Sequence, residues 1–239
     1  NYDAFNATLL DSPSFLTMDL NAGLALDPAS LLDSADRART NLENAAVIEA
    51  LSYDTSTGDL SFRVRNDTGH KLITGYPEGR RMFVNVKLYR AGSVVHEINP
   101  YDLTAGTLRG LDATYSPSSP PLGVAEEHDD DLVYEMHTSS TATGEHQTFH
   151  FVLADGRHKD NRIPPRGFRI TEAAARLSLP VSGGVENAAL FTAAEYLGGY
   201  DQVDLVVPTG ADGVLVSLYY QTITREYVEF LSDEINGVA

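Results

Sequence analysis

Hydrophobic and polar residues alternate along most of the chain after residue 51, which is the pattern of strands with one buried face. Turn-forming residues separate the alternating segments, for example at 56–59 and 211–213. No long helical pattern lies between them, so neighbouring strands are expected to pair antiparallel. The sequence therefore predicts an all-β chain, an antiparallel Ig-like β-sandwich of about seven or more strands. The predicted strands include 60–65, 82–89, 132–136, 148–153, 176–179 and 214–220.

The first 50 residues follow a different pattern. Apolar residues recur at roughly helical spacing from Ser30 to Leu51, as in a helix that packs one face on a sheet. Residues 1–28 mix polar and apolar residues with turn formers. We therefore expect an N-terminal arm and helix over residues 1–50 and a β-sandwich domain over residues 51–239.

The chain is strongly acidic. It has 34 acidic and 17 basic side chains, which gives a net charge of −17 at pH 7. This charge opposes binding to a phosphate backbone or an anionic membrane surface, so nucleic-acid partners and polybasic anchors are disfavoured. No apolar run reaches the ~20 residues of a membrane-spanning helix. The chain begins with Asn1 and shows no signal peptide, so we expect a processed or fragmentary chain.

Cysteine is absent from the sequence. Its absence excludes disulfides, thiolate metal sites, thiol nucleophiles and covalent c-type haem attachment. The sequence also lacks a G-x-S-x-G elbow, a Walker loop, a G-x-G-x-x-G loop and the histidine spacing of metalloenzymes. A glycosidase pair cannot be singled out in so acidic a chain. We therefore expect no enzymatic activity.

Two polar segments contain oxygen ligands of the kind that Ca²⁺ prefers, an acidic run at 126–131 and a turn at 155–161. The spacing of a helical calcium loop is missing from both, and acidic runs are commonly solvated loops. Cation binding and simple bracing of the loops therefore both remain open. The candidate Ca²⁺ ligands are Asp129, Asp130, Asp131, Asp155 and Asp160.

Histidine gives a weaker metal signal. His146 and His150 are predicted to share one face of a strand. At about 3.3 Å per residue they would lie about 13 Å apart, which is too far for one ion.

Residues 66–82 combine glycine, proline and charge between two predicted core strands. Glycines permit conformations that other residues resist, and constrained loops commonly position functional groups. His70 would then be an exposed ligand. The alternative is a structural loop in which His70 bonds carbonyls and Glu78 pairs with Arg80 or Arg81. The residues expected to shape the loop are Gly69, Gly75, Pro77, Glu78, Gly79, Arg80 and Arg81.

This segment, with Thr-Gly-His-Lys at 68–71 and Thr-Gly-Tyr-Pro-Glu-Gly-Arg-Arg at 74–81, resembles the T-G-H-K-x-P-T-G-Y-P-E-G-R-R signature of a family of secreted bacterial multihaem c-type cytochromes. In that family it lies in a β-sandwich domain C-terminal to the haem-binding region. Segments 131–135, 149–168 and 219–231 are similar to the same domain, in the same order. Ile73 departs from the pattern, which usually has proline there, and the haem-binding region is missing.

The resemblance implies a haem-free module that lies outside the cytoplasm (in the periplasm, at the cell surface or in the medium). It would associate with or cap a multihaem c-type cytochrome in electron transfer, either a separate chain or the N-terminal part of a longer one. His70 would then be a candidate distal ligand to a partner haem, and Lys71 a candidate contact for a haem propionate. The chain holds no haem covalently and cannot conduct electrons by itself.

Two rival functions remain open at this point. The first is an independent surface module that binds carbohydrate or a protein partner, with or without Ca²⁺, and uses Tyr101, Tyr196 and Tyr200 as exposed stacking rings. The second is a metal-dependent enzyme, which the missing ligand sets disfavour.

Two local predictions follow from the same residues. Arg80 and Arg81 should point to opposite faces, one reaching Glu78 or an acidic residue such as Asp160 and the other lying in solvent. The segment 163–168 contains two consecutive prolines, so it should be an extended surface connection rather than a helix, anchored by Ile163 and Phe168.

Overall fold

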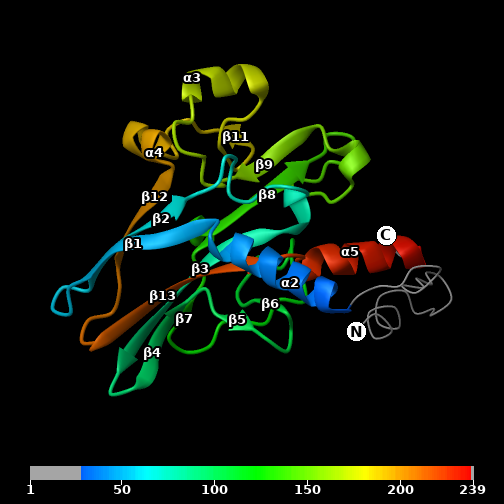
Figure 1. Ribbon diagram of the computed structural model, residues 1–239. Coiled ribbons are helices and arrows are strands. Elements are labelled where there is room, and N and C mark those ends of the chain that lie inside the picture. The colour runs from blue at the N-terminus through cyan, green and yellow to red at the C-terminus, as the bar shows by residue number, and fades with distance from the viewer. Residues whose placement is uncertain (1–27, 238–239) are drawn as a thin grey trace. The chain divides into compact units, whose positions relative to one another are not determined.

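The computed structural model describes residues 28–237 and is rich in strands, with an N-terminal helix and a few shorter helices (Figure 1). It divides into two compact units, residues 45–226 and residues 1–44 with 227–239. The predicted N-terminal arm over residues 1–27 lies outside the described residues. All the sheets belong to the first unit.

Helix α2 spans Pro28–Glu43, and a helix to Leu51 was therefore predicted too long. Residues Ala46–Tyr53 instead form strand β1. The β-branched pair Val47 and Ile48 favours a strand. Ile48 packs against the apolar core when β1 pairs with its neighbour, so tertiary packing overrides the helical spacing of the alanines.

The smaller sheet has three antiparallel strands in the order β1-β2-β12, with β2 at Asp59–Asn66 and β12 at Tyr200–Val206. In β2 the alternation predicted from the sequence is present, because Leu60, Phe62 and Val64 are buried between more exposed neighbours. The sheet therefore presents one apolar face.

The larger sheet has eight strands and is built around β3, Arg81–Arg90. Strand β13, Gly213–Gln221, pairs with β3 over nearly its whole length, and the two run side by side in Figure 1. On the other edge β3 pairs with β8 near its start and with β4 near its end. The remaining strands of this sheet are β4 Ser93–Ile98, β7 Glu126–Glu127, β8 Val133–Ser139, β9 Gly156–Asp160, β10 Val181–Ser182 and β11 Val185–Glu186.

One apolar cluster takes residues from both sheets. Its buried members are Leu60, Phe62, Val64, Leu72, Ile73, Met82, Val84, Val86, Leu88, Ile98, Leu132, Tyr134, Ile163, Val203, Val207 and Ala211. Leu72 and Ile73 belong to the loop between β2 and β3, so part of that loop is fixed by burial in this core.

Two of the predicted strands are wrong. Thr148 forms only an isolated bridge to Thr138, and Phe151–Leu153 is a 3₁₀ turn, η3. The apolar run at 151–153 does not alternate, and all three side chains are exposed. The predicted strand 176–179 begins inside a helical segment instead. Arg176 is the last residue of η4, Ala174–Arg176, which continues the short helix α3, Ile170–Ala173, where three consecutive alanines favour helix.

Short elements complete the structure. Strands β5, Tyr101–Asp102, and β6, Thr107–Leu108, form a separate two-stranded sheet. The turns η1, Pro77–Gly79, and η2, Asp130–Leu132, precede β3 and β8. Helix α4, Ala193–Gly198, begins with a capping box from Thr192 and Glu195 and leads into β12, whereas α5 spans Arg225–Asn236.

Candidate functional site

The loop between β2 and β3 is anchored by Asn66, the last residue of β2. Its buried amide Nδ2 donates to the carbonyls of His70, at 2.7 Å, and Ile163, at 3.0 Å. Its Oδ1 accepts from the backbone N–H of Thr68 at 2.8 Å and from the Thr68 hydroxyl at 2.6 Å. One side chain therefore ties the start of the loop to a segment almost 100 residues further along the chain.

His70 is exposed, and one of its ring nitrogens is engaged. Nδ1 lies 2.9 Å from the backbone oxygen of Lys71 and 3.2 Å from the Thr68 hydroxyl. Because a carbonyl only accepts, the contact assigns the proton of the neutral ring to Nδ1. Nε2 then carries the lone pair, and no partner for it occurs within residues 28–237. A histidine in this state can ligate a metal through Nε2 while the other nitrogen fixes its orientation.

Lys71 points into the protein rather than into solvent. Its Nζ lies 2.8 Å from Oδ2 of Asp160, and the side chains are 10% and 1% exposed. Burial lowers the pKa of Lys71, and the Asp160 carboxylate opposes that shift. The ammonium predicted to meet a haem propionate is therefore already bound within the protein.

Asp160 holds several cations together. Oδ1 lies 2.8 Å from Nε of Arg162, and Oδ2 also lies 3.3 Å from Nη1 of Arg157. Burial alone would raise the pKa of Asp160, but Arg162 and Lys71 outweigh it and keep the pKa below its ordinary value. The loop is thus fastened to the end of β9 by charge as well as by burial.

The second half of the loop forms η1, with Pro77 at its start. Gly75 has a φ of +86°, and a β-carbon there would lie 2.6 Å from Nη1 of Arg80, which packs over it. Glu78 is buried, and burial raises the pKa of its carboxyl. Its predicted ion pair with Arg80 or Arg81 is not formed, whereas Gly79 accepts a hydrogen bond from Thr224 N–H at 2.9 Å. A β-carbon at Gly69 would meet nothing within 4 Å.

As predicted, one of the two arginines pairs with an acidic residue, but the partner is neither Glu78 nor Asp160, and the other arginine is not fully in solvent. Arg81 is fully buried and donates to Glu226 in α5, and its Nε lies 3.9 Å from Oε2 of Glu135. Arg80 is half-buried and approaches the carbonyl of Thr74 at 3.4 Å. The start of β3 places Arg81 on the same face as Phe83, opposite the apolar core, where it is still buried and two carboxylates compensate its charge.

The two carboxylates beside Arg81, those of Glu226 and Glu135, make further contacts. Oε1 of Glu226 accepts from the hydroxyls of Thr107, at 2.8 Å, and Ser116, at 2.7 Å. Glu135 also lies 3.1 Å from Nζ of Lys159 and 3.2 Å from Nε2 of His137. No local sequence signal identifies Glu226 or Glu135 as partners, because 145 residues separate Glu226 from Arg81.

The five candidate Ca²⁺ ligands lie in different settings. Asp129 caps η2 by accepting from Asp131 N–H at 3.0 Å, and Asp130 lies 2.7 Å from Nζ of Lys159. Asp155 accepts from Thr141 N–H at 3.0 Å at the opposite end of β9 from Asp160. Within residues 28–237, no three His, Asp or Glu side chains are arranged to hold a metal ion.

The prediction that His146 and His150 share one face of a strand is wrong, because residues 146–150 form no strand. The His146 ring instead lies 5.8 Å from the His158 ring, measured between centroids.

Asp201 occupies a separate polar cavity of about 270 Å³ beside η2 and β12. The hydroxyl of Tyr134 donates to its Oδ2 at 2.6 Å. Burial raises the pKa of Asp201 to about 6, even though the Tyr134 hydrogen bond favours the ionised form. Burial also raises the pKa of Asp129, which lines the same cavity.

The segment 163–168, which follows β9, contacts the loop 66–82 through Ile163. Ile163 is buried and forms an isolated bridge with Leu72, and Phe168 stacks on Tyr196 with ring centroids 5.7 Å apart. Residues 163–168 contain no helix and end in a turn, with Phe168 N–H donating to Pro165 at 3.1 Å. The prediction of a non-helical connection anchored at both ends is confirmed, but the connection is not a surface one throughout, because Ile163 and Pro164 are buried, and it is not extended at the turn 166–167.

Comparison with known proteins adds little to this description. No protein-family model matches the chain, and no curated protein matches it. The crystal structure of a penta-heme cytochrome c552 from Thermochromatium tepidum resembles it with a TM-score of 0.48 and 14% sequence identity, over 80% of this chain and 35% of that one. A similarity of this degree does not establish a shared function. No helix within residues 28–237 is long and apolar enough to cross a membrane.

Proposed function

We propose that the chain is a haem-free, Ig-like β-sandwich module that associates with a multihaem c-type cytochrome, and that His70 supplies an axial ligand to one of the partner's haems. The sequence signature around His70 and the three further ordered segments support this family. The apolar core that takes residues from both sheets supports a sandwich. A cytochrome of this kind matures outside the cytoplasm, so we place the module there as well.

The observation that carries the proposal is the state of the His70 ring. Haem iron accepts the unprotonated nitrogen of a neutral imidazole. Nδ1–H of His70 is engaged by the Lys71 carbonyl, and Nε2 belongs to an exposed side chain. Asn66 holds the carbonyl of His70 itself, so the loop is fixed before any partner binds. A fixed ligand loses less conformational entropy on binding than a mobile one.

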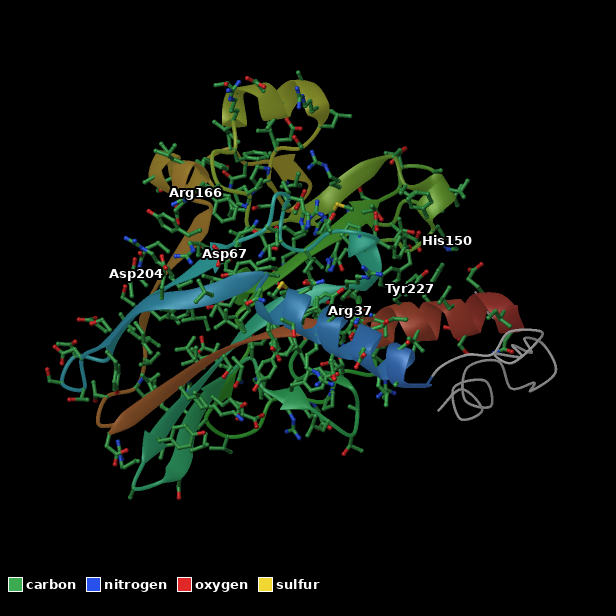
Figure 2. All side chains as sticks on the ribbon, in the orientation of Figure 1. Arg37, Asp67, His150, Arg166, Asp204 and Tyr227 are labelled. Carbon is green, nitrogen blue, oxygen red and sulfur yellow. The ribbon has the colours of Figure 1, made fainter. Side chains whose placement is uncertain are left out.

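Arg166 is better placed than Lys71 to meet a haem propionate. The N–H of Asn66 donates to the carbonyl of Gly199 at 2.8 Å, and Gly199 lies against the backbone of Arg166. Figure 2 labels Arg166 and Asp67 at the same end of the smaller sheet. Arg166 is exposed and has no ion pair among the described residues. Its guanidinium offers the bidentate geometry that carboxylates prefer.

A haem c octapeptide, whose iron lacks a strong distal protein ligand, tests His70 without requiring the natural partner. Titration of the peptide with the protein should shift the Soret band and convert high-spin to low-spin iron. His70→Ala should abolish most of this conversion, whereas His146→Ala, at another exposed histidine, should leave it intact. Equal conversion by both variants would contradict the proposal.

The tautomer of the free protein gives a second measurement. Two-bond ¹H–¹⁵N spectra above neutral pH should show His70 protonated at Nδ1, because Nδ1 lies 2.9 Å from the Lys71 oxygen. An Nε2–H form of His70 would remove the lone pair that the haem requires. His146, which has no such carbonyl contact within the described part of the chain, serves as the reference.

A further inference from the structure

A pocket of about 480 Å³ lies on the outer face of the large sheet. In β3, Met82, Val84 and Val86 enter the apolar core, so the alternating residues Phe83, Asn85 and Lys87 line the pocket on the opposite face. The β5–β6 sheet contributes Tyr101 (Figure 1). The volume is within the range of sites for small molecules.

Three aromatic rings form one side of this pocket. The Phe83 ring stacks on Tyr101, with centroids 5.8 Å apart and planes 9° apart, and on Tyr219, at 5.4 Å and 30°. Phe83 is buried, but Tyr219 is 48% exposed. The buried Phe83 ring therefore holds the exposed Tyr219 ring in a fixed orientation, which makes the free face of Tyr219 available to an apolar surface.

Polar groups line the side next to the rings. Asn85 donates from Nδ2 to Oε1 of Glu97 at 2.8 Å, and Nζ of Lys87 lies 3.5 Å from the same oxygen. Lys87 and Glu97 compensate each other in charge. The pocket therefore offers oriented donors and acceptors but no net charge that would favour an ion. The net charge of the whole chain, −17, also repels anions.

We propose that this pocket binds a neutral saccharide. A pyranose ring has an apolar C–H face, which would lie on Tyr219, and an edge of hydroxyl groups, which would meet Glu97 and Lys87. Asn85, whose Nδ2 already donates to Glu97 and to the carbonyls of Ile98 and Asn99, would hold the Glu97 carboxylate in place. Planar carboxylate and amide groups pair well with neighbouring hydroxyls, and a ligand that leaves such groups unpaired binds less tightly. The site is independent of His70 and of the haem-ligand role.

Of the tyrosines predicted to act as exposed stacking rings, only Tyr101 belongs to this pocket. Tyr196 is buried, and its hydroxyl donates to the carbonyl of Ala188, so that part of the prediction is wrong. Tyr200 is partly buried, and the Arg63 guanidinium lies 4.7 Å from the centre of its ring. Tyr219, the most exposed ring of the pocket, was not singled out from the sequence.

Saturation-transfer NMR with cellohexaose, maltohexaose, mannohexaose and chitohexaose tests the pocket. At least one of these sugars should receive saturation from the protein, with the strongest transfer to its ring C–H protons. Tyr219→Ala should weaken binding at least about tenfold, and Tyr219→Phe, which keeps the ring, should largely restore it. Tyr200→Ala, in the other sheet, should change nothing.

The proposal is overturned if none of the four sugars binds, or if Tyr219→Ala binds as well as the unchanged protein. A polyproline peptide provides the competing ligand, because aromatic grooves also bind extended proline-rich segments. Peptide binding that Tyr219→Ala abolishes, with no sugar binding, would assign the pocket to a protein partner instead. Circular dichroism of each variant shows that a loss of binding is not a loss of folding.

Discussion

The ammonium of Lys71 lies 2.8 Å from the carboxylate of Asp160, although 89 residues separate the two in the chain. Asp160 ends β9, and Lys71 follows the histidine of the exposed loop. The contact explains why a loop rich in glycine keeps a defined position, since the lysine beside His70 is tied to the larger sheet. Lys71 therefore orients the loop, while the neighbouring His70 side chain stays exposed.

Asp160→Asn should reduce the free energy of unfolding by about 3 kcal/mol, because Lys71, Arg162 and Arg157 would lose a buried counter-charge. Urea denaturation at pH 7 measures the loss. Asp155→Asn, at the exposed start of the same strand, is the matched control and should change stability little. Similar effects from both substitutions would show that the Asp160 cluster does not hold the loop.

The ion pairs of Asp160 also predict that the free energy of unfolding depends on pH in the acid range. The pKa of Asp160 is lowered in the folded protein, so its ionised form stabilises the fold above the ordinary aspartate pKa. This contribution is lost as the pH falls through the lowered pKa of the folded state. Asp160→Asn should therefore flatten the stability profile of the protein on the acid side, as measured by unfolding at a series of pH values.

The ionisation of Asp201 should change the stability of the fold with pH in the opposite direction. Its pKa of about 6 lies above that of an unfolded aspartate, so the folded state binds the proton more tightly. Stability should therefore fall as the pH rises from about 4 to 6 and level off above it. Asp201→Asn removes this charge while keeping an acceptor for Tyr134, and should stabilise the protein at pH 7 by about 2 kcal/mol, allowing for partial solvent exposure.

Chemical denaturation of the Asp201→Asn protein between pH 4.5 and 7.5 measures this effect. The gain over the unchanged protein should grow with pH across the interval. Asp204→Asn, at the rim of the same cavity, provides the control and should lack this dependence. A constant difference between the Asp201 variant and the unchanged protein would mean that Asp201 stays ionised throughout.

The sequence predicts the elements whose burial alternates along the chain. Strand β2 shows this period of two in its burial, whereas β3 is buried on both faces from Arg81 to Val86 and only its face with Met82, Val84 and Val86 enters the common core. Strand β1 was missed, since its alanines also fit helical spacing and only pairing with β2 decides the outcome. The segment 148–153 was misread because its consecutive apolar residues 151–153 lie exposed in a turn, and only Thr148 pairs, in an isolated bridge to Thr138.

The candidate sites were predictable to different extents. The loop 66–82 is recognisable from its composition, and a carbonyl partner for His70 is a local contact. Lys71 was assigned to a propionate because its true partner, Asp160, lies far away in the sequence. The aromatic pocket escaped prediction for the same reason. Phe83, Tyr101 and Tyr219 come from three different strands, and only the fold brings their rings together.

Arg166→Glu should weaken the binding of the haem c octapeptide at low salt, because the propionates would meet a like charge in place of a guanidinium. Removal of an exposed ion pair changes affinity by about 1 kcal/mol, so we expect a loss of about fivefold. The effect should shrink as salt is added, since exposed charges are screened. Titration at two salt concentrations, with Soret absorbance as the signal, measures both.

Arg176→Glu is the matched control for Arg166, because Arg176 is also an exposed arginine but lies in η4, outside the contacts of the Asn66 loop. It carries the same change in net charge, so it isolates the general effect of a more acidic protein. A specific role for Arg166 requires a larger loss than the Arg176 variant shows. Equal losses would mean that the chain's overall negative charge, rather than a contact beside His70, sets the affinity for the propionates.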